Sequence, residues 1–407
     1  MTISSRNTAS PRLGDVLSLF REQGSLTRAD VMQRTGLSRS TVNQRVDALV
    51  SAGLLSQDGE GAPTRGRPAG RFAFHAGGGV LLVADVGATG IRAALCDLAG
   101  KVSAEREARI EVADGPEPVL TGVDELFDQL LSEAGRNPAD VHGIGLDVPG
   151  PVDFASGRVV SPPIMRGWDR FDIPGWFASR YDCHVLVDKD VNAMAFGEQR
   201  SHYPDVDHLL MVKIGTGIGC GIIAGGQVHR GADGGAGDLG HIHITVDDVA
   251  EEPACRCGNT GCVEAYAGGW ALLRDLRAAG RDVSTVDEAV GLIRSGDLVA
   301  VRLARRAGRI LGEAVADAVN LFNPRVIAIG GQLAHTDEQL LAGIRELVYR
   351  RSLPLATRKL QIVRSQLDPR AGVIGLALLV ADVVFAPDLV EQWIDGRLSH
   401  RVLSLRP

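Results

Sequence analysis

Apolar residues near the N-terminus recur with helical spacing in three short segments. The first, residues 13–21, has apolar positions three or four apart and is followed by Gly24, a residue that commonly ends a helix. Thr27 can cap a second helix over residues 28–34, and Ser38 can cap a third. The buried stripe of the third helix is expected to consist of Val42, Val46, Leu49 and Val50.

The outward face of the third predicted helix carries side chains suited to reading DNA. In the major groove, arginine pairs with guanine, and asparagine or glutamine with adenine. The residues left on this face are Arg39, Ser40, Thr41, Asn43, Gln44 and Arg45. A polar third helix would also suit a solvated three-helix bundle that docks another protein.

The segment after these helices favours DNA binding. Residues 56–70 are rich in Gly and Pro and lead into an apolar strand, which predicts a β-hairpin wing. Three arginines of this wing would be available for phosphates or the minor groove: Arg65, Arg67 and Arg71. Residues 1–75 contain ten Arg and six acidic residues, a balance of +4 within a chain whose net charge is −7. The segment from Leu26 to Val42, with the helix that continues to Ala52, resembles the winged helix-turn-helix of bacterial repressors, and we take residues 1–75 as a DNA-binding domain.

Beyond residue 75 the chain alternates apolar strands with glycine-rich turns. The first turn contains Asp85, Gly87, Thr89 and Gly90, and the second contains Gly215, Thr216, Gly217 and Gly219. Backbone N–H groups in such turns can bind phosphate, and Asp85 could hold magnesium through water. A β-hairpin that needs positive φ would explain either turn alone. Two such turns together favour a nucleotide-binding scaffold of the α/β class.

Two further strands follow. The one in residues 143–153 runs into a Pro149-Gly150 loop, and the one in residues 185–192 ends in Asp188, Lys189 and Asp190 before a helix. Ligands collect at such strand ends in α/β sheets. Asp190 could act as a general base toward a sugar hydroxyl, or it could simply cap the helix that follows. A helix, Pro324 and a buried strand over residues 326–329 form a third unit near the C-terminus.

Length and composition indicate where the protein works. A chain of 407 residues suggests two or three domains. It has no signal region after the first arginines and no apolar run near the roughly 18 residues of a membrane span. Three of its six cysteines are scattered singly. We therefore expect a cytoplasmic protein without a membrane partner.

The other three cysteines form a metal-binding motif. Cys255, Cys257 and Cys262 lie in a Cys-x-Cys-x4-Cys motif, and His241 can supply a fourth ligand from a nearby strand end. Four protein ligands leave no open position, so the predicted site is structural zinc. The alternative is that these are ordinary buried or disulfide-bonded cysteines.

With these motifs, nearly the whole chain resembles the ROK family of repressors, open reading frames and kinases. The run Gly237–His241 and residues 255–268 look like the family's metal signature. The resemblance implies zinc on the four metal-motif residues, and sugar contacts from Lys189, Asp190, Asp238, His241 and Glu264. It implies an actin-like, sugar-kinase body over residues 76–407, with one lobe of approximately 76–195 plus 385–407 and another of 196–384.

Three departures from the kinases of this family bear on catalysis. Lys189 replaces an asparagine, Asp238 replaces a glutamate, and the first turn reads Gly87-Ala88-Thr89-Gly90 instead of Gly-Gly-Thr-Lys. Lys189 could pair with Asp190 and weaken it as a base. We therefore expect a sugar-responsive transcriptional regulator, a repressor of carbohydrate genes that binds operator DNA as a homodimer or homotetramer. The alternative is a sugar kinase, which would use Asp190 as catalytic residue with ATP and magnesium.

Overall fold

The computed structural model describes residues 11–60, 70–247, 251–336 and 338–394. Its first domain has three helices, α1 (Leu13–Gln23), α2 (Arg28–Thr35) and α3 (Arg39–Ser51). Strands β1 (Leu26–Thr27), β2 (Leu55–Glu60) and β3 (Gly70–Phe74) form a sheet in the order β1-β3-β2. The Thr27 hydroxyl accepts from the Asp30 N–H, and the Ser38 hydroxyl accepts from the Thr41 N–H. The three predicted helices and both caps are confirmed.

Two expectations for this domain are wrong. Val42, Val46 and Leu49 are fully buried, but Val50 is 39% exposed. The buried face of α3 therefore ends at Leu49, and Val50 lies outside it. Arg71 does not point away from the domain. Its Nε donates to the Ser25 hydroxyl at 3.1 Å, and a second nitrogen donates to the Ser25 carbonyl. The guanidinium therefore fastens the wing to the loop after α1.

The first lobe is built on a five-stranded sheet ordered β10-β7-β4-β5-β6. Its strands are β4 (Val80–Val86), β5 (Ile91–Cys96), β6 (Val102–Ala108), β7 (Val141–Val148) and β10 (His184–Lys189). Helices α4 (Pro116–Glu133) and α5 (Ile173–Ala178) cover one face, and α13 (Ala371–Val384) covers the other. The small hairpin of β8 (Val152–Asp153) and β9 (Arg158–Val159) extends from this lobe. Near-continuous apolar strands are typical of a sheet buried on both faces.

The second lobe repeats this plan with a sheet ordered β13-β12-β11-β14-β15. Its strands are β11 (Leu209–Ile214), β12 (Ile218–Ala224), β13 (Gln227–Val228), β14 (Val326–Gly330) and β15 (Gln361–Arg364). Helix α6 (Asp190–His202) contacts β11 and β12. The remaining helices of the lobe are α7 (Val263–Ala267), α8 (Gly269–Ala278), α9 (Val286–Arg294), α10 (Leu298–Phe322), α11 (Gln339–Arg351) and α12 (Pro354–Thr357).

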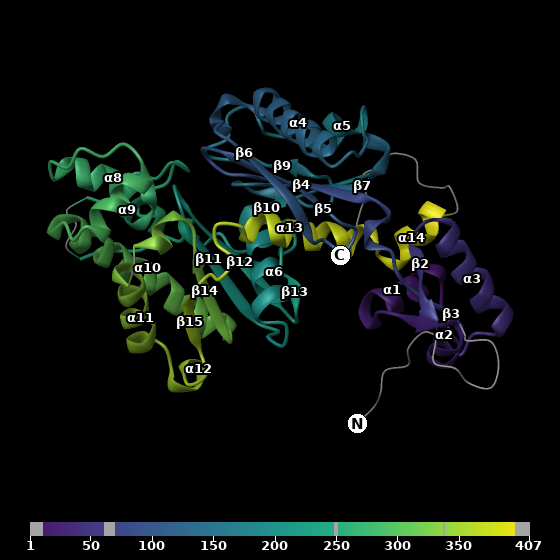
Figure 1. Cartoon of the computed structure of the whole chain (residues 1–407). Coiled ribbons are helices and arrows are strands. Elements are labelled where there is room, and N and C mark those ends of the chain that lie inside the picture. The colour runs from purple at the N-terminus through teal and green to yellow at the C-terminus, as the bar shows by residue number, and fades with distance from the viewer. Residues whose placement is uncertain (1–10, 61–69, 248–250, 337, 395–407) are drawn as a thin grey trace.

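The two lobes meet where α6 crosses α13 (Figure 1). Gly197 and Gly375 face each other there, and a Cβ on Gly375 would lie 1.7 Å from the Ala193 carbonyl oxygen. Helix α6 therefore covers the second sheet, and α13 covers the first. The expected lobe boundaries at 195/196 and 384/385 do not match these contacts, since they cut α6 and leave α13 with the wrong lobe.

The described end of the chain, α14 (Pro387–Ile394), packs on α1 of the DNA-binding domain as well as on α13. Trp393 also contacts the His142 ring of the first lobe, with ring centroids 5.1 Å apart. The described end of the chain thus returns to the first lobe, as expected, and it also contacts the DNA-binding domain. In the part of the chain that the structure describes, no single helix is long and apolar enough to cross a membrane; α13 and α14 would pass only as a pair bent by 61°.

We predict that Gly375→Ala destabilises the protein by about 3 kcal/mol or more, since the added methyl meets backbone that cannot move without separating the helices. Gly291→Ala is the matched control. It lies on the exposed side of α9, its added Cβ would meet nothing within 4 Å in the described structure, and it should gain about 0.5–1 kcal/mol. Urea unfolding followed by circular dichroism compares the two. Equal midpoints would contradict this account of the crossing.

Candidate metal centre and ligand cleft

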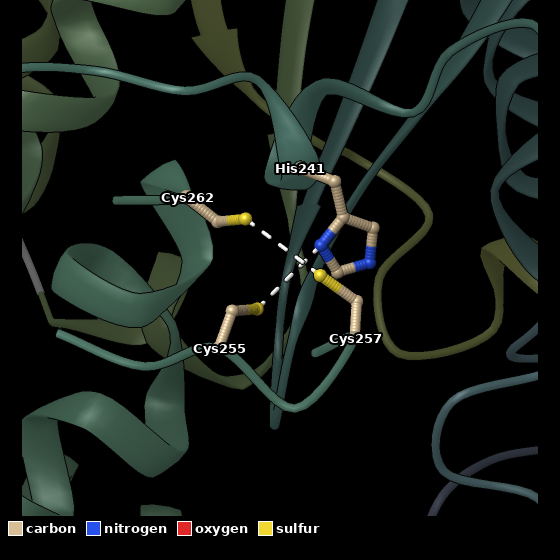
Figure 2. Close-up of side chains that lie close together, drawn as sticks. All are labelled: His241, Cys255, Cys257 and Cys262. Carbon is tan, nitrogen blue, oxygen red and sulfur yellow. Dashed lines mark hydrogen bonds between the residues drawn. The ribbon is translucent and has the colours of Figure 1, made fainter. Parts of the chain in front are cut away.

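The four predicted metal ligands converge in the structure (Figure 2). His241 ends a short 3-10 turn, and the cysteines lie on the loop leading into α7. One ligand atom from each residue lies within 4.8 Å of the others. The Cys255 sulfur is 3.7 Å from His241 Nδ1, and the Cys257 and Cys262 sulfurs are 3.7 Å apart. All six cysteines are free, so the disulfide alternative does not hold.

The chemistry of this donor set fits zinc. Burial and the neighbouring thiols raise the pKa of Cys262 to about 12, and burial also raises the pKa of Cys255. Burial opposes ionisation of Cys257 too, but hydrogen bonds from Asn259 and the other thiols outweigh it and lower its pKa. Three thiols packed this closely cannot all ionise without a cation between them, and zinc binds such thiolates at tetrahedral sites.

Beside this centre lies a cleft of about 960 Å³ between the lobes. The cleft brings together the predicted nucleotide-turn residues, Asp85, Gly87, Thr89, Gly215, Thr216 and Gly217. It also brings together the predicted sugar-contacting residues, Lys189, Asp190, Asp238, His241 and Glu264. His241 directs Nδ1 at the sulfurs and its other ring nitrogen away from them (Figure 2), so the two nitrogens can serve two different partners.

Glu264 is held rigidly in this cleft. Its Oε2 accepts from the Ile218 N–H at 2.9 Å, and its Oε1 accepts from the Trp270 indole at 3.1 Å. A Cβ on Gly217 would lie 2.4 Å from Glu264 Oε2. The lack of a side chain at Gly217 therefore allows the Glu264 carboxylate to lie against the turn. The alternative explanation by positive φ is wrong for both turns, since Gly87, Gly90, Gly215, Gly217 and Gly219 all lack it.

Asp190 has a different partner from the expected one. Lys189 points its ammonium at the Ala236 carbonyl, 3.2 Å away. Lys213 instead donates to Asp190 Oδ2 at 2.6 Å, and the Val191 N–H donates to Oδ1 at 2.7 Å. The cause is that α6 packs on β11, which brings the Lys213 ammonium to the first residue of the helix. The two residues are far apart in the sequence, which therefore does not predict this contact. The one feature that points to Lys213 is that it is a lysine within an otherwise apolar strand.

Two more aspartates lie near the cleft, Asp188 at the predicted strand end and Asp147, which no sequence motif singles out. Asp188 binds Arg230, with N–O distances of 2.6 and 3.0 Å, and accepts from the Asn192 amide at 2.7 Å. Asp147, in β7, is fully buried beside it. In the sequence, the signal for Asp147 is a carboxylate near the end of an otherwise apolar strand.

On the DNA-binding domain, α3 lies on the side away from the lobes (Figure 1). Arg39, Ser40 and Gln44 are exposed there, and Thr41 is half-buried. Asn43 accepts a hydrogen bond from Arg28 at 3.0 Å. Arg45 is half-buried, and its Nη1 has no partner among the described residues. Arg65 and Arg67 lie outside the described residues.

These features define a class of protein: a winged-helix domain joined to a two-lobed body with a sugar-kinase-like cleft and a cysteine-rich metal motif. Comparison with known proteins agrees. Residues 81–383 match the ROK family, and residues 11–56 match a winged helix-turn-helix DNA-binding model. The chain belongs to the ROK family.

Its relatives include regulators and kinases. A putative xylose repressor of Caldicellulosiruptor sp. is 30% identical, covering 92% of this chain and 96% of its own. The crystal structure of a ROK family transcriptional regulator, a homologue of Escherichia coli MLC, is 26% identical with a TM-score of 0.78 and covers 94% of this chain and 98% of its own. A Streptomyces griseus ROK glucokinase in complex with glucose and AMPPNP is 28% identical with a TM-score of 0.64, and covers 74% of this chain and 99% of its own.

We predict one zinc ion per chain and its loss in Cys257→Ser, because removing one thiolate opens the four-ligand shell. Cys183→Ser is the matched control, since this half-buried cysteine lies outside the metal motif and should leave the metal content unchanged. Protein purified without chelators is analysed by atomic emission. Absence of zinc from the wild type, or full zinc content in Cys257→Ser, would refute the assignment.

Proposed function

We propose that this protein is a sugar-responsive repressor of carbohydrate-metabolism genes. The observation that carries the proposal is the docking of a DNA-binding domain on the lobes that form the cleft. The regulator structure covers 94% of this chain, whereas the glucokinase covers 74% of it. A relative named as a xylose repressor makes D-xylose the first sugar to test. A DNA-bound regulator of this kind works in the cytoplasm.

A continuous set of contacts supports coupling between the cleft and the DNA-binding domain. Helix α6 begins at Asp190 in the cleft and carries Arg200 in its last turn. Arg200 and Arg21 of α1 both bind Asp382 of α13, at 3.4 and 3.2 Å. Arg21 also lies over the Phe385 ring, 5.2 Å from its centroid. A sugar that favours one cleft geometry would move α6 and, through Asp382, the position of α1.

The second candidate is a sugar kinase that transfers phosphate from ATP. It is favoured by the nucleotide-turn residues, which line the same cleft as the sugar residues. The contact between Lys213 and Asp190 argues against a kinase. The Lys213 ammonium donates to Asp190 Oδ2, the oxygen that a general base would present to a sugar hydroxyl. We propose that sugar binding persists while phosphate transfer is poor, because transfer also needs an aligned base and nucleotide. Magnesium and ATP belong to this candidate only.

Symmetric operators favour a homodimer, since two α3 helices would then read two related half-sites. The residues proposed to face DNA are those predicted on α3, together with Arg65 and Arg67 of the wing. Among the described ones, Arg39, Ser40 and Gln44 are the most accessible. Asn43 would first have to leave Arg28.

We expect Gln44→Ala to weaken binding to an operator selected from random duplexes by about tenfold, because one good base contact contributes roughly 1–3 kcal/mol. Ser51→Ala, an exposed change at the end of the same helix, is the control and should bind as the wild type does. Fluorescence anisotropy measures both affinities. Unchanged affinity and sequence preference in Gln44→Ala would remove this residue from the interface.

Glu264→Ala should abolish the effect of D-xylose, D-glucose or N-acetylglucosamine on operator affinity while leaving sugar-free DNA binding largely intact, because Glu264 is a rigidly placed acceptor inside the cleft. Glu125→Ala, exposed on α4, is the control. Operator titrations with and without each sugar give the result. A sugar response that survives in Glu264→Ala would contradict the proposed sugar site, and rapid ATP-dependent phosphorylation of the sugar would favour the kinase.

A further inference from the structure

Three aspartates occupy one row across the first-lobe sheet. Asp147 of β7 is paired with Asp188 of β10 on one side and with Asp85 of β4 on the other. Asp188 is neutralised by Arg230, and Asp85 opens into the cleft. Asp147 lies between them with no exposed surface, and neither of its carboxyl oxygens accepts from a donor group among the described residues. The Asp85 carboxyl lies within hydrogen-bonding reach, and such a contact between two acids needs a proton on one of them. An ionised carboxylate in this position would be costly.

Charge neutralisation comes from the other lobe. Lys213 lies on β11, and its ammonium binds Asp190 Oδ2 at 2.6 Å. Burial alone would lower the pKa of Lys213, but Asp190, Asp85 and Asp147 outweigh it and raise the pKa. Lys213 therefore remains charged, and it joins β11 of the second lobe to the residue that begins α6.

We propose that Lys213 is the positioning residue of the sugar site and that Asp147 is its protonated companion. Lys213 holds Asp190 from β11, the strand beneath the start of α6, so that the remaining acceptor sites of Asp190 face the cleft in a fixed orientation. The proton on Asp147 removes one negative charge from the group of carboxylates around Lys213. The single Lys213 ammonium then has fewer carboxylates to neutralise. This inference rests on the proposed sugar site, and it adds two residues outside the motifs on which the resemblance is based.

The protonation of Asp147 follows from its surroundings. Burial, followed by the nearby Asp85 and Asp190, raises the pKa of Asp147 well above its usual value, and Lys213 opposes this only in part. The charged and titratable groups around it are Asp85 on β4, Asp188 with Arg230, Lys189 on β10, Asp190 on α6 and Lys213 on β11. An acid with a raised pKa in the folded state costs stability as the pH rises above its unfolded value. Removing Lys213 takes away the cation that balances the other carboxylates of the cluster, so that proton uptake at lower pH becomes the remaining way to reduce its negative charge.

Thermal unfolding of the full chain at about pH 5.5 and about pH 8 tests this without any ligand. Lys213→Met should lower the midpoint by on the order of 10 °C at the higher pH, and by less than half as much at the lower pH. Lys101→Met, at an exposed lysine, should change neither midpoint. A loss in Lys213→Met that is the same at both pH values would overturn the proposal, because it would reflect packing alone.

Asp147→Asn supplies the second variant, since asparagine has the shape of a protonated aspartate. It should unfold at no lower temperature than the wild type at about pH 8, and the midpoint of the double variant with Lys213→Met should depend less on pH than that of Lys213→Met alone. A large destabilisation by Asp147→Asn alone would show that the ionised carboxylate is needed, and would overturn the proposal even if Lys213→Met fails to fold.

Sugar-binding measurements distinguish a failure of this inference from a failure of the proposed function. At about pH 5.5, where Lys213→Met is expected to remain folded, its D-xylose affinity should be at least about tenfold weaker than that of the wild type. Wild-type affinity in Lys213→Met would overturn the positioning role. If neither D-xylose nor the other two sugars stabilises the wild type, the proposed function fails, while the pH comparisons still decide the charge arrangement.

Discussion

The contact between α6 and α13 is the constraint on which the rest of the molecule depends. Each helix covers the sheet of a different lobe, and the two backbones approach so closely at Gly197 and Gly375 that no side chain fits between them. Interfaces packed this tightly shift between discrete arrangements and do not deform gradually. Both helices begin at the cleft. The start of α6 carries Asp190, and Gly372 at the start of α13 lies against Asp85.

The far ends of the same helices support the DNA-binding domain. Asp382 accepts from Arg200 of α6 and from Arg21 of α1, and Phe385 contacts Phe74 of the wing edge-on at 5.3 Å. Exposed ion pairs of this kind contribute little free energy. Their importance here is geometric, because one carboxylate on α13 is shared between the cleft helix and the DNA-binding domain.

Local patterns in the sequence predicted local structure well. The caps at Thr27 and Ser38, the glycine turns between strands and the Cys-x-Cys-x4-Cys motif each depend on neighbouring residues, and the structure places them as expected. The errors concern contacts between distant segments. Lys213 lies 23 residues from Asp190, on a strand that the sequence does not place beside it, whereas the sequence alone predicts the adjacent Lys189 as the partner. The lobe boundaries failed for the same reason, since helical periodicity does not tell which sheet a helix covers.

Hydrogen–deuterium exchange with and without a saturating sugar tests the central claim, that occupancy of the cleft reaches the DNA-binding domain through α6 and α13. The sugar is the one that stabilises the protein most in a thermal-shift comparison. We predict altered exchange in α6, in the last turn of α13 and in α1, in addition to the residues that line the cleft. Changes confined to the cleft, with α1 exchanging identically in both states, would contradict this account.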